Sequence, residues 1–158
     1  MRIEVDLSGC DIFRENSVLG ISDCNGLIKG FQMNKDIING LQDNWKAGKY
    51  FCRYSKRGLG FFKAMVYSSI ICCLLESVNI KELELEICRG LRFHENNIKQ
   101  RLNKLLRKRL NINVNSINFK CMKGTDVDNY VYLMFKDNYN LLPTYANLFL
   151  ADIEKFLG

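Results

Sequence analysis

The sequence predicts an α/β domain built on one five-stranded mixed sheet with helices on both faces. Three observations predict this class. Apolar residues alternate with polar ones near the N-terminus, an Asn-Gly pair separates two apolar runs, and helical patterns then alternate with strand patterns. The expected order of the main elements is β-β-β-α-β-α-β-α. No repeat or linker interrupts this order, so we expect residues 1–158 to form a single domain.

The first three strands are expected to form an antiparallel meander. In residues 2–8, Ile3, Val5 and Leu7 alternate with polar residues, which is the period of a strand with one buried face. Residues 18–22 and 27–33 flank Asn25-Gly26. This pair is a strong hairpin signal because both turn residues must reach positive φ.

Helices and two further strands are expected after the meander. Residues 60–77 are apolar nearly all round, which is typical of a buried helix. Residues 81–88 alternate between aliphatic residues and glutamates, and residues 111–122 show a second strand pattern. The expected helices cover residues 35–49, 60–77, 94–110 and 125–136, with a last helix after Pro143.

Composition excludes several classes of protein. The chain has 158 residues, of which 47% are hydrophobic and 25% charged, as in an ordinary globular domain. No leader pattern is present, and the longest nearly apolar run, residues 64–75, is too short to cross a bilayer. We therefore expect a cytoplasmic protein with no membrane partner. The net charge of +6 permits a polyanionic partner.

The cysteines argue against a structural zinc site. There are seven cysteines, no C-x-x-C pair, and a single histidine, His94. Scattered cysteines among apolar neighbours are typical of buried thiols in a reducing compartment.

Several carboxylates fall on expected strands and at a helix start. They are Asp6 in the first strand, Glu84 and Glu86 on one face of residues 81–88, and Asp126 and Asp128 beside Thr125. Magnesium prefers oxygen ligands, and paired metal ions assist phosphodiester hydrolysis. These acids also have structural interpretations: Asp6 could be an exposed strand residue beside Glu4 on a wet face, the glutamates could belong to a solvated strand face, and a Thr125–Asp128 capping box alone accounts for Asp128. Asp126 is therefore the preferred ligand at that helix.

The element order and these acids resemble the ribonuclease H-like superfamily, which includes ribonucleases H, Holliday-junction resolvases and integrases. The resemblance covers nearly the whole chain in topology. In that superfamily one aspartate lies in the first strand, matched here by Asp6. A carboxylate on the fourth strand is matched by Glu86, with Glu84 as a rival, and acids opening a late helix are matched by Asp126 and Asp128.

The resemblance implies a nuclease that uses Mg²⁺ or Mn²⁺, with Asp6, Glu86 and Asp126 as catalytic ligands and Glu84 and Asp128 assisting. A ribonuclease H would place a glutamate early in its first long helix. Here that helix has no acid before Glu76, so a resolvase-like arrangement fits better.

A basic, aromatic-rich segment predicts contact with nucleic acid. Residues 44–75 contain no acid, and cations there alternate with aromatic residues that could stack on unpaired bases. A second basic run covers residues 99–109. The expected contacts are Trp45, Lys46, Lys49, Arg53, Lys56, Arg57, Arg101, Lys104 and Lys108. The alternative is that the aromatic rings are core and the cations are a solvated rim.

Two functions follow from these patterns. The first is a metal-dependent nuclease that hydrolyses phosphodiester bonds of DNA or RNA. The second is a non-catalytic nucleic-acid-binding or assembly module on the same fold. They differ in whether the carboxylates converge within metal-bridging distance. The sequence contains no P-loop, dinucleotide-binding fingerprint or G-x-S-x-G motif, which argues against a cofactor enzyme.

Overall fold

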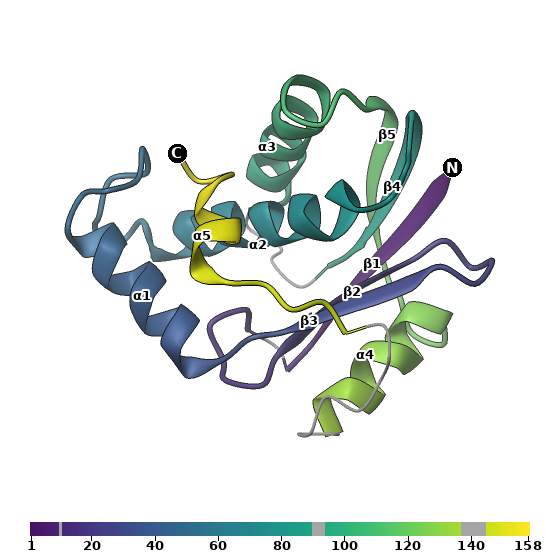
Figure 1. Cartoon of the computed structure of the whole chain (residues 1–158), viewed down its shortest axis with the longest axis horizontal. Helices are drawn as coiled ribbons and strands as arrows, with labels where there is room; N and C mark the ends of the chain where they lie inside the picture. The colour runs from purple at the N-terminus through teal and green to yellow at the C-terminus, as the bar shows by residue number, and fades with distance from the viewer. Residues whose placement is uncertain (10, 90–93, 137–144) are drawn as a thin grey trace.

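A computed structural model describes residues 1–9, 11–89, 94–136 and 145–158. Five strands form one mixed sheet in the order β3-β2-β1-β4-β5 (Figure 1). The strands are β1 (Arg2–Ser8), β2 (Val18–Ser22), β3 (Ile28–Gln32), β4 (Glu82–Cys88) and β5 (Asn113–Lys120). The helices are α1 (Lys35–Lys46), α2 (Leu59–Glu76), α3 (Glu95–Lys108), α4 (Asp126–Lys136) and α5 (Leu150–Glu154). The predicted α/β class and the five-stranded mixed sheet are confirmed.

The meander forms as predicted, but its hairpin turn differs in detail. β1 pairs antiparallel with β2, and β2 pairs antiparallel with β3. Positive φ occurs at Cys24 (65°) and Gly26 (108°), where the sequence predicted it for Asn25 and Gly26. The reason is the Asp23 carboxylate, which accepts hydrogen bonds from the backbone N–H groups of Asn25 and Leu27 at 2.8 and 3.0 Å. A side-chain-capped turn thus replaces the tight two-residue turn.

The other half of the sheet is parallel. β4 pairs with β1 and with β5, and Glu4 of β1 stands directly beside Glu86 of β4. The alternation in β4 buries Leu83, Leu85 and Ile87 completely, so its glutamates all lie on the opposite face.

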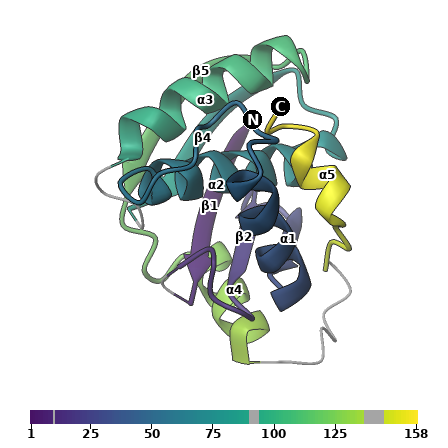
Figure 2. The same ribbon diagram turned by 90° about the vertical axis from the view of Figure 1, so that its left-hand side faces the viewer.

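Helices cover the two faces unequally (Figures 1 and 2). The main core lies between the sheet and α2 and α3, with α1 and α5 packed beside α2. By length and composition α2 is apolar enough to cross a membrane, but 72% of it is buried inside the fold. On the other face α4 packs on β1, β2 and β3. Glu82 and Glu84 of β4 are exposed, which explains how a strand in the middle of the sheet tolerates acids.

A segment near the C-terminus lies along the β3 border of the sheet. Tyr145 forms a parallel bridge with Gly30, and the Ala146 N–H donates to the Gly30 carbonyl at 2.7 Å.

Candidate acidic site and basic surface

Asp6 of β1 faces α4, and its close approach to that helix depends on a glycine. The register places Gly20 of β2 beside Asp6. A Cβ atom at Gly20 would stand 2.4 Å from Cγ1 of Val131 in α4, so only glycine lets the helix come this close. Asp6 is consequently only 7% exposed, and its carboxylate accepts a hydrogen bond from the Leu7 N–H at 2.9 Å. At Glu4 and Asp6 the polar face of β1 is therefore buried, not solvated.

The first turn of α4 brings Asp128 to Asp6. Burial raises the pKa of Asp6 to about 6, and the neighbouring Asp128 carboxylate raises it further. Hydrogen bonds from the Cys88 thiol and the Leu7 N–H oppose this rise without cancelling it. None of the ion pairs between described residues involves Asp6 or Asp128. Two carboxyl groups without a counter-cation share one small space.

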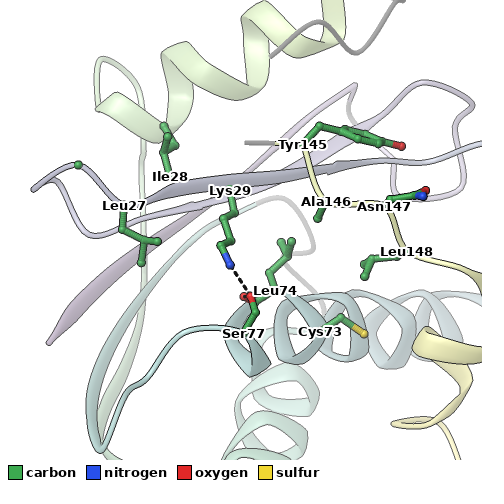
Figure 3. Close-up of a pocket in the computed structure, with 11 residues that line it drawn as sticks. Leu27, Ile28, Lys29, Cys73, Leu74, Ser77, Tyr145, Ala146, Asn147 and Leu148 are labelled. Carbon is green, nitrogen blue, oxygen red and sulfur yellow. Dashed lines mark hydrogen bonds between the residues drawn. The ribbon is translucent and has the colours of Figure 1, made fainter. Parts of the chain in front are cut away.

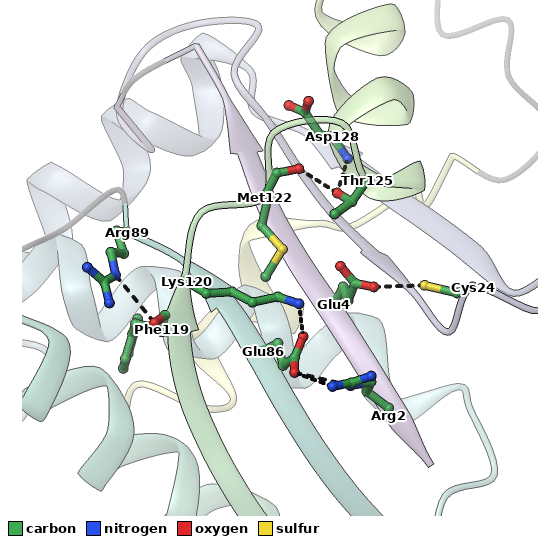
Figure 4. A network of polar contacts seen from close by, with 10 residues as sticks. All are labelled: Arg2, Glu4, Cys24, Glu86, Arg89, Phe119, Lys120, Met122, Thr125 and Asp128. Atoms are coloured by element: carbon green, nitrogen blue, oxygen red, sulfur yellow. Dashed lines mark hydrogen bonds and ion pairs between the residues drawn. The ribbon is translucent and has the colours of Figure 1, made fainter.

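Hydrogen bonds at the start of α4 fix the position of Asp128 (Figure 4). The Asp128 N–H donates to Thr125 Oγ1 at 3.2 Å, which confirms the predicted cap. Asp128 Oδ2 accepts a hydrogen bond from the Gly124 N–H at 2.9 Å. A capping box would instead use the N–H of Thr125, one residue later. Asp126 is exposed and lies near the Cys24 thiol. The structure therefore brings Asp128 to Asp6 and places Asp126 toward Cys24.

Glu86 is held by two cations from neighbouring strands (Figure 4). Arg2 Nη2 lies 2.8 Å from Glu86 Oε1, and Lys120 forms an ion pair with Glu86 Oε2. The contact with Lys120 has the largest effect and, together with the contact with Arg2, holds the pKa of Glu86 below its ordinary value, although burial acts in the opposite direction. Both oxygens of this predicted metal ligand are thus engaged within the protein.

Glu4 is a buried carboxylate that the sequence suggested only as part of a wet face. It is 8% exposed, and Cys24 Sγ donates to its Oε1 at 2.8 Å. This hydrogen bond raises the pKa of Cys24 to about 11. Glu4 Oε2 is buried without a hydrogen-bond partner among the described residues. The alternation of Glu4 with Asp6 could have identified it, because residues two apart share a strand face.

The strand register separates Glu84 from Asp6. Val5 pairs with Ile87, so the β4 residue next to Asp6 is Cys88, whose burial raises its pKa to about 11. Glu84 lies four residues earlier, about 13 Å along the strand. It is exposed beside Arg2 and cannot share one ion with Asp6.

The basic segment is sorted by the fold into buried and exposed residues. Trp45 is 3% exposed, and its ring stacks on that of Phe62 with the ring centres 4.4 Å apart. Its indole N–H donates a hydrogen bond to the Cys52 carbonyl at 2.9 Å. Trp45 is therefore part of the core. The cations before α2 are exposed: Lys46, Lys49, Arg53, Lys56 and Arg57.

The cations of α3 extend this surface. Lys104 and Lys108 are exposed, whereas Arg101 is half-buried and places its guanidinium 4.7 Å from the centre of the Phe51 ring. Arg101 also donates to the Phe156 carbonyl. The exposed cations of α3 and of the loop before α2, which meet where Arg101 lies over Phe51, are called the basic surface.

A cavity of about 510 Å³ opens at the β3 border (Figure 3). Its walls include Leu27, Leu74 and Leu148, and Lys29 crosses it to reach the Ser77 hydroxyl. It shares no residue with the acidic site.

Within the described ranges no three His, Cys, Asp or Glu side chains are grouped so that they alone could hold a metal ion. Comparison with protein-family models, with curated proteins and with solved structures finds no match to this chain.

Proposed function

We propose that the protein is a metal-dependent nuclease of the ribonuclease H-like kind, acting on DNA or RNA in the cytoplasm. A meander followed by two parallel strands, with a helix that brings an acid onto the first strand, supports this proposal. The observation that carries it is the approach of Asp128 to Asp6 without a counter-cation among the described residues. Carboxylates brought together in this way repel one another unless they share a proton or a cation.

The residues present fit Mg²⁺ or Mn²⁺ in one specific way. Magnesium is commonly held by one or two protein carboxylates, with waters and substrate phosphates completing its shell. Asp6 and Asp128 supply two carboxylates, so a third protein ligand is unnecessary. When bound, the ion would activate water and stabilise the leaving oxygen of a phosphodiester. Glu4, whose Oε2 is buried without a hydrogen-bond partner in the part of the chain that the structure describes, adds negative potential on the same face.

The protein's own residues have separate tasks in this proposal. Asp6 and Asp128 hold the ion, and Thr125 fixes Asp128 by capping α4. Arg2 and Lys120 neutralise Glu86 and keep it beside Glu4, so Glu86 shapes the local charge without binding the ion directly. Asp126 is a candidate for the outer edge of the site because it is exposed.

The basic surface lies on the face of the sheet covered by α2 and α3, opposite the face on which Asp6 meets α4, so a substrate would have to pass around the end of the sheet to reach Asp6. α3 begins after the carboxyl end of β4, and a Cβ at Gly60 of α2 would stand 2.4 Å from His94 Nε2, directly before α3. The start of α2 thus lies beside the start of α3, and the loop before α2 meets α3 where the Arg101 guanidinium lies over the Phe51 ring. Ligands of open α/β sheets bind outside the carboxyl ends of strands where the connections diverge.

One observation favours the alternative, a non-catalytic nucleic-acid-binding module. The fourth-strand carboxylate Glu86 is occupied by Arg2 and Lys120, and of the predicted acids only Asp6 and Asp128 are brought together. In this alternative the basic surface binds nucleic acid and the acids only shape the fold.

A cleavage assay separates the two functions. Labelled single-stranded, duplex, hybrid and branched substrates are incubated with Mg²⁺, Mn²⁺ or EDTA. We expect metal-dependent cleavage that falls at least about 100-fold in Asp6→Asn and in Asp128→Asn, since losing a metal ligand removes several kcal/mol of transition-state stabilisation. Glu84→Gln is the matched control, because it removes an exposed acid about 13 Å away on the same sheet face. Absence of cleavage with all four substrates would leave the binding module as the function, whereas equal cleavage by Asp6→Asn would show that the reaction does not depend on a metal held by Asp6.

A further inference from the structure

We infer that the loop of residues 47–58, between α1 and α2, is a binding surface for single-stranded nucleic acid, with Phe51 and Tyr54 as base-stacking side chains. This inference names the substrate class of the proposed function and rests on it for the link to cleavage. Binding itself requires neither a metal nor the acids.

Buried anchors fix this loop against the core. Tyr50 and Cys52 are buried, and the residues between and after them point outward. The Tyr50 hydroxyl donates to Glu154 at 2.7 Å, and the Cys52 carbonyl accepts the Trp45 indole N–H at 2.9 Å. Because alternate residues are anchored inside, the exposed side chains start from a fixed backbone, which reduces the entropy lost on binding.

Two aromatic rings stay exposed although the core lies directly beneath them. Phe51 is 54% exposed and Tyr54 is 44% exposed. The Arg101 guanidinium lies over the Phe51 ring, and the Trp45 ring meets Tyr54 edge-on at 4.7 Å. Each ring is therefore supported by one neighbour while part of its surface is open to solvent. Exposed aromatic side chains set among cations are the combination that binds unpaired bases and their phosphates together.

The charge on the exposed side of this loop is positive. Lys49, Arg53, Lys56 and Arg57 are exposed, and none of them appears in an ion pair between described residues. Lys104 and Lys108 continue the surface along α3, reaching about 10 Å beyond Arg101 at 1.5 Å per residue. A nucleic-acid backbone could follow this path and release counterions at each contact.

The rings distinguish a single strand from a duplex. In a duplex the bases are stacked on one another, so a protein surface meets mainly phosphates and groove edges. An unpaired base offers its face to an aromatic ring, and such stacking tolerates any sequence. Cations alone would bind both forms, whereas Phe51 and Tyr54 favour the single strand.

The test is fluorescence anisotropy with labelled oligonucleotides in EDTA, so that cleavage plays no part. A single strand and its duplex are compared, each as DNA and as RNA. We expect Phe51→Leu and Tyr54→Leu each to weaken single-strand binding about tenfold, as stacking energies suggest, and to leave duplex binding unchanged. Phe149→Leu is the matched control, because Phe149 is 66% exposed outside this loop.

Other outcomes have definite meanings. Unchanged single-strand affinity in both loop variants, or an equal loss with duplex, would overturn the inference. If the wild type binds as expected in EDTA but never cleaves, the inference stands and the proposed nuclease function fails. Thermal unfolding of each variant verifies that the fold is retained.

Discussion

Glu4 and Glu86 stand side by side on neighbouring parallel strands, yet only Glu86 is paired with cations. Arg2 and Lys120 both bind Glu86, while Glu4 has only the Cys24 thiol as a donor among the described residues. The central face of the sheet thus carries excess negative charge beside a locally neutralised carboxylate. This imbalance is the physical basis of the proposed cation site.

Lys120→Met should destabilise the protein by about 1 to 2 kcal/mol, because the Glu86 side chain is only 12% exposed and would lose one of its two cations. The free energy of unfolding in urea measures this change. Lys155→Met is the control: its pair with Glu76 is exposed on both sides, so a loss below about 0.5 kcal/mol is expected. Equal losses in the two variants would show that burial of Glu86 is unimportant.

Asp6 should make stability depend on pH. Its pKa is raised from 3.8 to about 6 in the folded protein, so the folded state favours the protonated carboxyl group. The resulting contribution to the free energy of unfolding is fully present below about pH 4 and is lost as the pH rises through about 6. When the pH is lowered from 7.5 to 4.5 without divalent cations, the free energy of unfolding of the wild type should rise by about 1 to 2 kcal/mol relative to that of Asp6→Asn. Urea unfolding at several pH values gives this difference. A constant difference would mean that Asp6 is ordinarily ionised in the folded state.

Mg²⁺ should stabilise the wild type at pH 7.5. At ten times its Kd the ion adds about 1.4 kcal/mol, which for a chain of this size raises Tm by about 3 to 5 °C. Asp6→Asn and Asp128→Asn should abolish the shift, whereas Glu84→Gln should retain it because Glu84 lies far from Asp6 along the strand. Differential scanning calorimetry with and without EDTA measures it. A shift that persists in Asp128→Asn would place the ion elsewhere.

Gly20→Ala should displace α4. The added Cβ would stand 2.4 Å from Val131 Cγ1, and overpacking of this kind costs about 1 to 3 kcal/mol. Any Mg²⁺-dependent stabilisation should weaken as well, because Asp128 moves with the helix. Adding Val131→Ala makes room and should restore both properties in part. If the double variant is as unstable as Gly20→Ala alone, the added Cβ must clash with a residue other than Val131 where α4 packs on β2.

The elements of the fold were predictable from the sequence because each has a local cause. The alternation in residues 2–8 and the turn residues near Asn25 determine strands from nearest neighbours alone. The grouping of the acids was not predictable in the same way. It depends on the register between β1 and β4, strands far apart in the chain, and this register puts Cys88 rather than a glutamate beside Asp6.

The basic segment illustrates a second limit of sequence reasoning. Its aromatic residues have similar character, but the fold buries Trp45 and Tyr50 and leaves Phe51 and Tyr54 exposed. Only the packing partner decides this, since Trp45 stacks on Phe62 of α2. The exposure of Glu84 was likewise not predictable from the acids of β4 themselves. It follows from the packing of α4 on β1, β2 and β3, which leaves this face of β4 open to solvent at Glu84.

The segment beside β3 also bears on how copies of this chain can associate. Since Tyr145 and Ala146 pair with Gly30, one border of the sheet already has a neighbouring backbone. The opposite border is β5, whose Asn113, Asn115 and Asn118 are exposed polar residues of low strand preference. A second copy could pair along β5 without displacing any backbone, whereas along β3 it would have to displace the contact at Gly30. Two copies paired through β5 would each turn the β3 border outward, where this contact opposes the addition of a further strand.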